Sequence, residues 1–294
     1  MRNALSMVAI GLIAMTAASC NKKDEKQAAA PHLASHRAVY ELSLARANSN
    51  AQVTDVSGKL VLEWQDTCEG YTTNQRFLTQ FTNTDGGVLL SDLAVSSWES
   101  ADGDRFRFNV VSTVNGKIEE HAQGDARRDA KSGEATAHFD SPQGEKLTLP
   151  TGTLFPTEHM VRLIEAARSG ARMFSQPMFD GSFENGMSDV SAFIGNPMDA
   201  AVGEATTAPP PGLTADDDAL KLLAGRAWPI RMAFYTHGDD APQSTPDYEF
   251  SLHLRANGVA SDLEFDYGDF SVGAKLTTIE ALPGCDLAHA KPDQ

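Results

Sequence analysis

Short runs that alternate between apolar and polar residues recur along this chain, and they restrict its fold more than any other feature. Residues 36–46 place Tyr40, Leu42 and Leu44 on one face, which is typical of a half-buried β-strand. Similar runs cover 59–64, 71–81, 88–98, 105–114, 248–254, 263–267 and 271–281. Turn signals lie between many of them, at Gly86-Gly87, Asp102-Gly103, Asn115-Gly116 and Asn257-Gly258, where tight hairpins need positive φ. The sequence therefore predicts antiparallel meanders.

Two meanders with one apolar face each must bury these faces together or roll into a barrel. We therefore expect a mainly all-β fold with one large core. One amphipathic helix is predicted at about 157–169, with Thr157 as its N-cap after Pro156 and Gly170 as its stop. An amphipathic helix between two β halves is expected to plug or flank their shared core.

The mature chain reads as one domain over residues 36–285, followed by a C-terminal tail at 286–294. Residues 196–227 carry three prolines at 209–211 and the acidic triplet 216–218. Polyproline is a semi-rigid spacer rather than a strand, and the acidic triplet is expected to cap a short helical turn. We interpret 196–227 as a surface insertion, with a boundary between two domains as the alternative.

The first residues predict export. Arg2 precedes an apolar run that is too short to span a bilayer and ends in small residues before Cys20, so residues 1–19 read as a signal peptide. Cys20 is a candidate for lipidation, and ordinary cleavage after Ser19 is the alternative. Residues 20–35 are polar at first and then rich in alanine, as in a flexible tether.

The charge of the chain excludes one class of partner. Its formal net charge is −16, which repels phosphate backbones and anionic lipid surfaces, so no nucleic-acid partner is expected. No apolar run of about 20 residues follows the signal, so no membrane-spanning helix is expected there.

Three cysteines, Cys20, Cys68 and Cys285, bear on the compartment. If Cys20 carries lipid, the other two form a pair, and an exported protein is where such a pair oxidises. Two separate buried thiols are the alternative.

Motifs for chemistry are weak. There is no G-x-S-x-G elbow, and the histidines show no metal-binding spacing, so neither a cofactor nor a metal is expected. His159 and His253 are read as structural or surface residues. The acidic run 262–269 lacks the glycine of a calcium loop and reads as a strand with an acidic outer face. A cell-wall glycan hydrolase that uses Asp266 and Asp269 is the second alternative for the function.

The order of several short motifs resembles the EipB-like cell-envelope integrity family. They are His36-Arg37-Ala38-Val39-Tyr40, Cys68-Glu69-Gly70-Tyr71, Phe106-Arg107-Phe108, Gly124-Asp125-Ala126, Leu149-Pro150, Gly152-Thr153-Leu154-Phe155-Pro156-Thr157 with His159, Asp180-Gly181-Ser182, Trp228-Pro229, Asn257-Gly258-Val259 and Asp266-Tyr267-Gly268-Asp269-Phe270. The resemblance implies a spiral-like, broken β-barrel with one helix and a disulfide that matches Cys68 and Cys285. It also implies a periplasmic role in envelope integrity without a known enzymatic activity.

The sequence thus favours a non-enzymatic periplasmic protein, tethered to a membrane if Cys20 is lipidated, that supports envelope integrity through contacts with other envelope components. A carrier is the first alternative, because a barrel of this size can enclose an apolar ligand. Aromatic residues could line its cavity or simply fill the core: Tyr40, Trp64, Phe77, Phe108 and Phe250.

Overall fold

The structure is a computed structural model that describes residues 31–183, 186–199, 211–238 and 245–285. It has two helices, α1 (Pro156–Arg168) and α2 (Asp217–Leu222), among the described residues. The strands are β1 (His36–Ala47), β2 (Val53–Asp66), β3 (Gly70–Asn83), β4 (Val88–Ser100), β5 (Arg105–Val114), β6 (Lys117–Arg128), β7 (Ala135–Ser141), β8 (Lys146–Leu149), β9 (Met173–Phe179), β10 (Met187–Ile194), β11 (Met198–Asp199), β12 (Arg226–Thr236), β13 (Tyr248–Arg255), β14 (Ala260–Asp266) and β15 (Phe270–Ala281).

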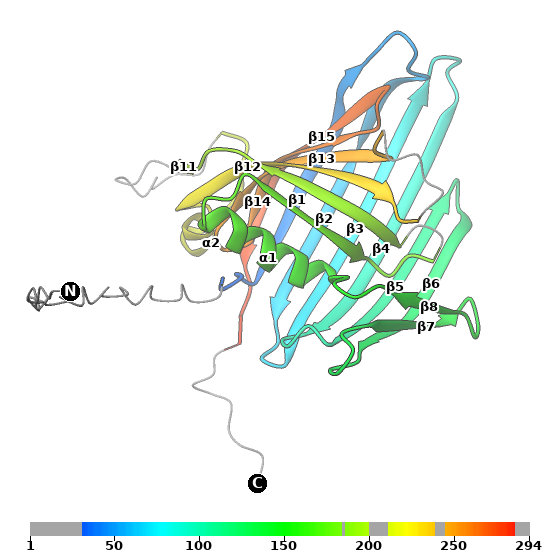
Figure 1. Cartoon of the computed structure of the whole chain (residues 1–294). Coiled ribbons are helices and arrows are strands. Elements are labelled where there is room, and N and C mark those ends of the chain that lie inside the picture. The colour runs from blue at the N-terminus through cyan, green and yellow to red at the C-terminus, as the bar shows by residue number, and fades with distance from the viewer. Residues whose placement is uncertain (1–30, 184–185, 200–210, 239–244, 286–294) are drawn as a thin grey trace, which may run out of the picture.

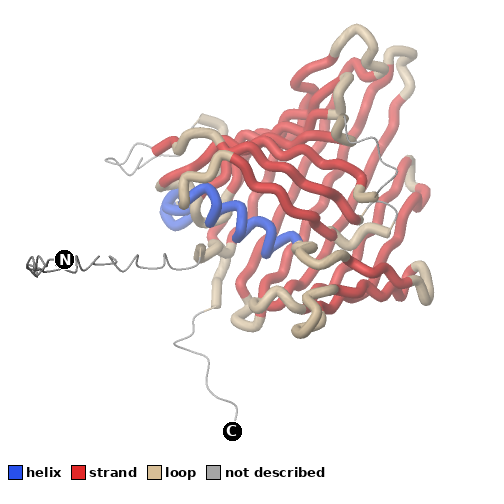
Figure 2. Tube along the Cα trace, in the orientation of Figure 1, coloured by secondary structure: helices blue, strands red, loops and turns tan. Residues whose placement is uncertain are grey.

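All these strands belong to one sheet, in the order β8-β7-β6-β5-β4-β3-β2-β1-β15-β14-β13-β12-β10-β9, with β11 paired to β12. Because β1 pairs antiparallel with both β2 and β15, the N-terminal and C-terminal meanders are continuous. In Figure 1 the long strands β1 to β6 form one wall, and β12 and β13 cross in front of it. The tube in Figure 2 shows the same curled wall in red. The predicted rolled antiparallel sheet is therefore confirmed.

The barrel is broken between its two edge strands, β8 and β9. The segment that follows β8 reaches across to β9, where the Leu154 amide donates to the Pro177 carbonyl over 2.9 Å. The Leu154 carbonyl in turn accepts a hydrogen bond from the Phe179 amide. This bridge ties the start of α1 to β9, so the helix lies at the opening of the sheet.

The inner face of the sheet holds the core. Side chains from β1, β2, β10 and β12 to β15 pack on α1 through Leu163, Ile164 and Ala167. A second cluster of mainly phenylalanines and alanines joins β5, β6 and β7 to the segments around α1 and β9. Its rings lie close together, with Phe106 and Phe155 stacked at 5.0 Å. Both clusters bury the apolar faces that the alternation predicts.

The N-terminus of α1 differs from the prediction. Phe155 is the N-cap residue and makes no side-chain cap, while Pro156 occupies the first turn. The predicted cap, Thr157, is already inside the helix, and its amide donates to the carboxylate of Glu99 from β4. A residue distant in sequence therefore replaces the local cap.

The described part of the 196–227 segment packs onto the barrel. Asp216 caps α2 by accepting a 2.7 Å hydrogen bond from the Ala219 amide, as expected for the acidic triplet. Ala219 is fully buried against Val259 and Ile279, so α2 covers the end of β15. Residues 200–210, with two of the three prolines, lie outside the described residues.

Candidate functional site

A disulfide links the turn between β2 and β3 to the C-terminal end of the domain. Cys68, at positive φ in the turn between β2 and β3, bonds to Cys285, 217 positions later, with their Cα atoms 4.9 Å apart. Around it, Gln65 donates to the Pro283 carbonyl and the Asp66 amide donates to the Ser35 hydroxyl. The predicted pairing is confirmed, and it ties both ends of the domain to one hairpin.

The outer face of β3 to β7 carries a polar pocket of about 530 Å³, which we call the outer-face pocket. Two rows of facing residues cross the strands here. In each row, every residue is the cross-strand partner of the next, from β3 through β4 and β5 to β6. One row consists of Thr72, Trp98, Arg107 and Asp125, and the other consists of Asn74, Ser96, Asn109 and Gln123. The full lining is Thr72, Asn74, Ser96, Ser97, Trp98, Arg107, Phe108, Asn109, Gln123, Gly124, Asp125, Arg127 and Asp140.

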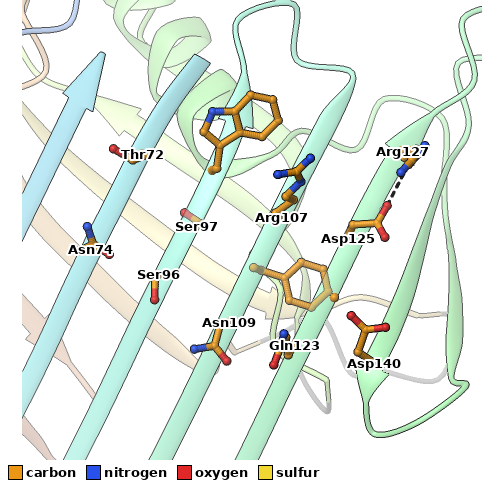
Figure 3. A pocket seen from close by; sticks show the side chains of 13 residues that line it. Thr72, Asn74, Ser96, Ser97, Arg107, Asn109, Gln123, Asp125, Arg127 and Asp140 are labelled. Atoms are coloured by element: carbon orange, nitrogen blue, oxygen red, sulfur yellow. Dashed lines mark hydrogen bonds and ion pairs between the residues drawn. The ribbon is translucent and has the colours of Figure 1, made fainter. Parts of the chain in front are cut away.

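Figure 3 shows how these side chains project from neighbouring strands, with a dashed line between Arg127 and Asp125. That ion pair is 2.9 Å long. Two further guanidinium groups, those of Arg105 and Arg107, each lie 5.2 Å from the centre of the Trp98 ring. The pocket thus combines an aromatic surface, cations, two carboxylates and uncharged polar groups.

A β-bulge shapes one side of the pocket. The register of β6 and β7 shifts between Gln123 and Gly124, and a β-carbon at Gly124 would lie 2.1 Å from the His138 carbonyl oxygen. Only glycine tolerates this approach. The bulge leaves Asp140 without a partner in the strand register, and such a bulge redirects side chains.

A second outer pocket of about 720 Å³ lies near the other end of β1 to β4. Its apolar lining includes Leu78 and Leu90, and its charged lining includes Glu41, Lys59 and Lys275. It has no aromatic side chain among its lining residues. The second pocket therefore offers a different and less defined surface.

On the inner face, Glu99 is a buried carboxylate that holds the start of α1. It accepts hydrogen bonds from the Thr157 and Glu158 amides at 2.8 and 2.7 Å. Burial raises the pKa of Glu99 to about 7, although the two amide hydrogen bonds oppose that rise. Arg128 pairs with Glu158 at 3.0 Å beside it. Sequence reasoning missed this arrangement.

Two more inner groups have shifted pKa values. Burial lowers the pKa of His159 to about 4, and its ring lies 5.2 Å from Phe174. Burial also raises the pKa of Asp180 to about 6. Its carboxylate accepts the Ser182 amide at 2.8 Å. His159 is thus a core residue, and Asp180 stabilises its own turn.

The candidate cavity-lining residues divide into two groups. Tyr40, Trp64 and Phe108 are buried within the core clusters. The Tyr40 hydroxyl donates to the Ala260 carbonyl. Phe77 and Phe250 are only partly buried, and both contact Phe265. The partly buried rings line the inner face, so a role for them in binding an apolar ligand stays a prediction.

The acidic residues of the hydrolase hypothesis hold loops together. Asp266 pairs with Arg46 at 2.7 Å and accepts the Gly268 amide, and Asp269 accepts from the Asn48 side chain. His253 contacts Asp262 at 2.9 Å. In the described ranges, no three His, Cys, Asp or Glu side chains are grouped so that they could hold a metal ion.

The predicted signal peptide, Cys20 and the C-terminal tail lie outside the described residues, and so does most of the predicted tether. Neither described helix has the length and apolar character needed to cross a bilayer.

Comparison with known proteins agrees with this architecture. The structure resembles the crystal structure of a β-barrel-like protein of a domain of unknown function from Brucella abortus, with a TM-score of 0.74 and 29% sequence identity, covering 86% of this chain and 100% of that one. The fold is therefore that of the β-barrel-like class.

The sequence places the chain more narrowly. The EipB-like family matches residues 27–283, so the chain belongs to this family. The chain is also 32% identical over 260 residues to the cell envelope integrity protein EipB of Brucella abortus, with 86% of each sequence covered. The name of that relative supports a role in the cell envelope, and the predicted resemblance is confirmed.

Proposed function

We propose that this protein acts in the periplasm, without catalysing a reaction, and supports cell-envelope integrity by binding other envelope components. The observation that carries this proposal is the Cys68–Cys285 bridge in a member of the EipB-like family. Disulfides persist in oxidising compartments such as the periplasm. The predicted signal peptide at residues 1–19 accounts for delivery there.

The arrangement of acidic residues supports a binding role rather than catalysis. Asp266 and Asp269, the proposed hydrolytic pair, are engaged in loop contacts with Arg46 and Asn48. Glu99 faces the inside and is occupied by two helix amides. Catalysis by an acid requires a group within reach of a substrate, and these contacts favour stability of the barrel.

The first test is the intact mass of the mature protein from a Gram-negative host, with and without reduction and thiol alkylation. We expect two alkylated thiols only after reduction, and a diacylglyceryl increment at the N-terminus if Cys20 is lipidated. An unlipidated chain that begins near Cys20 would indicate a soluble periplasmic protein. Free Cys68 and Cys285 in the native sample would contradict the proposed compartment.

The envelope role is tested by deleting the gene in its host. The deletion strain should become more sensitive to detergent and to cell-wall antibiotics, and the full-length gene should restore resistance. A version without residues 1–19 is the matched control, since it encodes the same domain without export. Equal resistance of the deletion and wild-type strains would contradict the role.

A carrier function is the second candidate, favoured by the partly buried inner rings. Phe250 and Phe77 pack on Phe265 at 4.7 and 5.6 Å, while each keeps some exposed surface. Large partly exposed aromatic surfaces are typical of sites for apolar ligands. Native mass spectrometry of protein purified from its envelope should show bound lipid, and a bare mass would contradict this candidate.

A further inference from the structure

The outer-face pocket contains amide side chains that have no partner in the described part of the protein. Asn74, Asn109 and Gln123 come from β3, β5 and β6, and none forms a side-chain hydrogen bond with another residue in the described part of the chain. Each amide offers two donors and one acceptor. Neighbouring strands lie about 4.8 Å apart, a spacing comparable to the length of one sugar ring. The row therefore suits a polymer that presents hydroxyl and acetamido groups at regular intervals.

Trp98 supplies an apolar surface beside these amides. It is a partly buried aromatic on the polar, outward face of β4, where it faces Thr72 on one side and Arg107 on the other. Aromatic faces carry partial negative charge and attract positively polarised C–H groups. The C–H face of a sugar ring is such a surface, whereas its edge of hydroxyls matches the amides.

The cations of the pocket indicate the charge of the ligand. Within the described ranges, no carboxylate lies within ion-pair distance of the Arg105 or Arg107 guanidinium, although the chain has a net charge of −16. Arg127 already neutralises Asp125. Asp140 also lines the pocket but is not paired with Arg107. The Arg107 guanidinium lies over the Trp98 ring, and a guanidinium binds carboxylates through paired hydrogen bonds of its N–H groups, so Arg107 can pair with an acidic group of a ligand.

From these three features we propose that the outer-face pocket binds an acidic glycan of the cell-wall type, in which amino-sugar rings carry carboxylate-bearing peptides. A sugar ring stacks on Trp98, its polar groups bind Asn74, Asn109 and Gln123, and a carboxylate pairs with Arg107. This inference rests on the proposed envelope function and names one envelope component.

The test is co-sedimentation of the purified mature chain with insoluble peptidoglycan sacculi from a Gram-negative bacterium. We expect Trp98→Ala and Arg107→Gln each to weaken binding roughly tenfold, since a stacked ring or a charge-assisted hydrogen bond contributes on the order of 1.4 kcal/mol. Trp98→Phe keeps an aromatic face and should retain most of the binding. Circular dichroism and thermal unfolding verify that each variant is folded.

Arg76→Gln is the matched control, because Arg76 lies on the outer face of β3, outside the pocket, and is paired with Asp92 at 2.7 Å. It should bind sacculi like the wild type. Soluble muropeptides should compete for binding better than neutral oligomers of N-acetylglucosamine, because only the former carry carboxylates. Equal competition by both would overturn the role assigned to Arg107.

Three results would overturn the proposal: no co-sedimentation, equal binding by all variants, or binding to lipopolysaccharide but not to sacculi. These results are separate from the test of the envelope role. If sacculi are not bound but the deletion strain remains sensitive to detergent, the glycan site is wrong and the proposed function stands. If the deletion strain has no phenotype, the proposed function fails whatever the sacculi show.

Discussion

The outer surface of the barrel is built in two different ways. Around β1, β2 and β15, Arg37 pairs with Glu63 and with Glu280 across the strands. On β4 and β5, by contrast, Arg105 and Arg107 lie over Trp98, although Arg76 pairs with Asp92 and Arg127 pairs with Asp125 on the neighbouring strands. We call the first area the closure region, because the Cys68–Cys285 bridge also lies there.

This difference separates stability from recognition. Side chains that form ion pairs with each other have few hydrogen-bonding groups left for a ligand. Exposed charged side chains without an ion-pair partner add little to the free energy of unfolding and are available to a ligand. Changes in the closure region should therefore alter stability and leave glycan binding intact. Changes in the outer-face pocket should do the reverse.

The largest expected effect is loss of the bridge. Replacing Cys68 and Cys285 together by serine should lower the free energy of unfolding by about 2 to 5 kcal/mol, because the bridge restricts the unfolded chain. Urea unfolding under oxidising conditions measures this loss. Reduced wild-type protein is the control and should unfold like the double variant. An unchanged urea midpoint would contradict the stabilising role of the bridge.

Glu99 gives the next effect, and it depends on pH. This residue follows Trp98 in sequence but points to the inner face, near Glu158 of α1 and Tyr71 of β3. Burial raises the pKa of Glu99 in the folded protein to about 7. The contribution of its protonated form to stability is therefore fully present at pH values below the usual pKa of a glutamate. That contribution is lost as the pH rises through 7.

Glu99→Gln removes this titration. The stability of the variant relative to the wild type should therefore rise between pH 5 and pH 8, by about 2 to 3 kcal/mol, as measured by urea unfolding. His36 and His159, whose pKa values are lowered by burial, are present in both proteins, so their titration cancels. A stability difference that stays constant with pH would show that Glu99 does not titrate in this range.

Much of the sheet could be predicted because apolar side chains alternate on its long strands. The runs at 36–46, 71–81 and 105–114 all lie within β1, β3 and β5. The alternation did not predict strands β6 to β12, and for β6 the structure shows a physical reason. Its inward residues include Ala122, Gly124 and Ala126, which leave room for large rings opposite and give no apolar alternation.

The candidate site was only partly predictable. The disulfide could be predicted from the number of cysteines, the expected compartment and the family resemblance. The role of Glu99 could not be predicted, because it depends on α1, which begins nearly 60 residues later in the sequence. The sequence pattern of β4 nevertheless marks Glu99 and Trp98 as exceptions. Along β4, Glu99 has the same parity as the inward Leu93 and Val95, while Trp98 has the parity of polar residues. Charged residues on an apolar face and aromatic residues on a polar face indicate special roles.

The smallest expected effects on stability come from replacing one arginine by glutamine in each of the two regions. Arg37→Gln breaks two partly exposed ion pairs and should lower the urea midpoint slightly, with the loss reduced by salt. Arg107→Gln breaks no ion pair in the described chain but removes the contact of Arg107 with the Trp98 ring, so its midpoint should fall less than that of Arg37→Gln and should not depend on salt. In the sacculus assay the order should reverse, with Arg37→Gln like the wild type and Arg107→Gln weakened. If both variants lost binding equally, general surface charge rather than the outer-face pocket would explain attraction to the glycan, and the contrast between the two regions would no longer describe function.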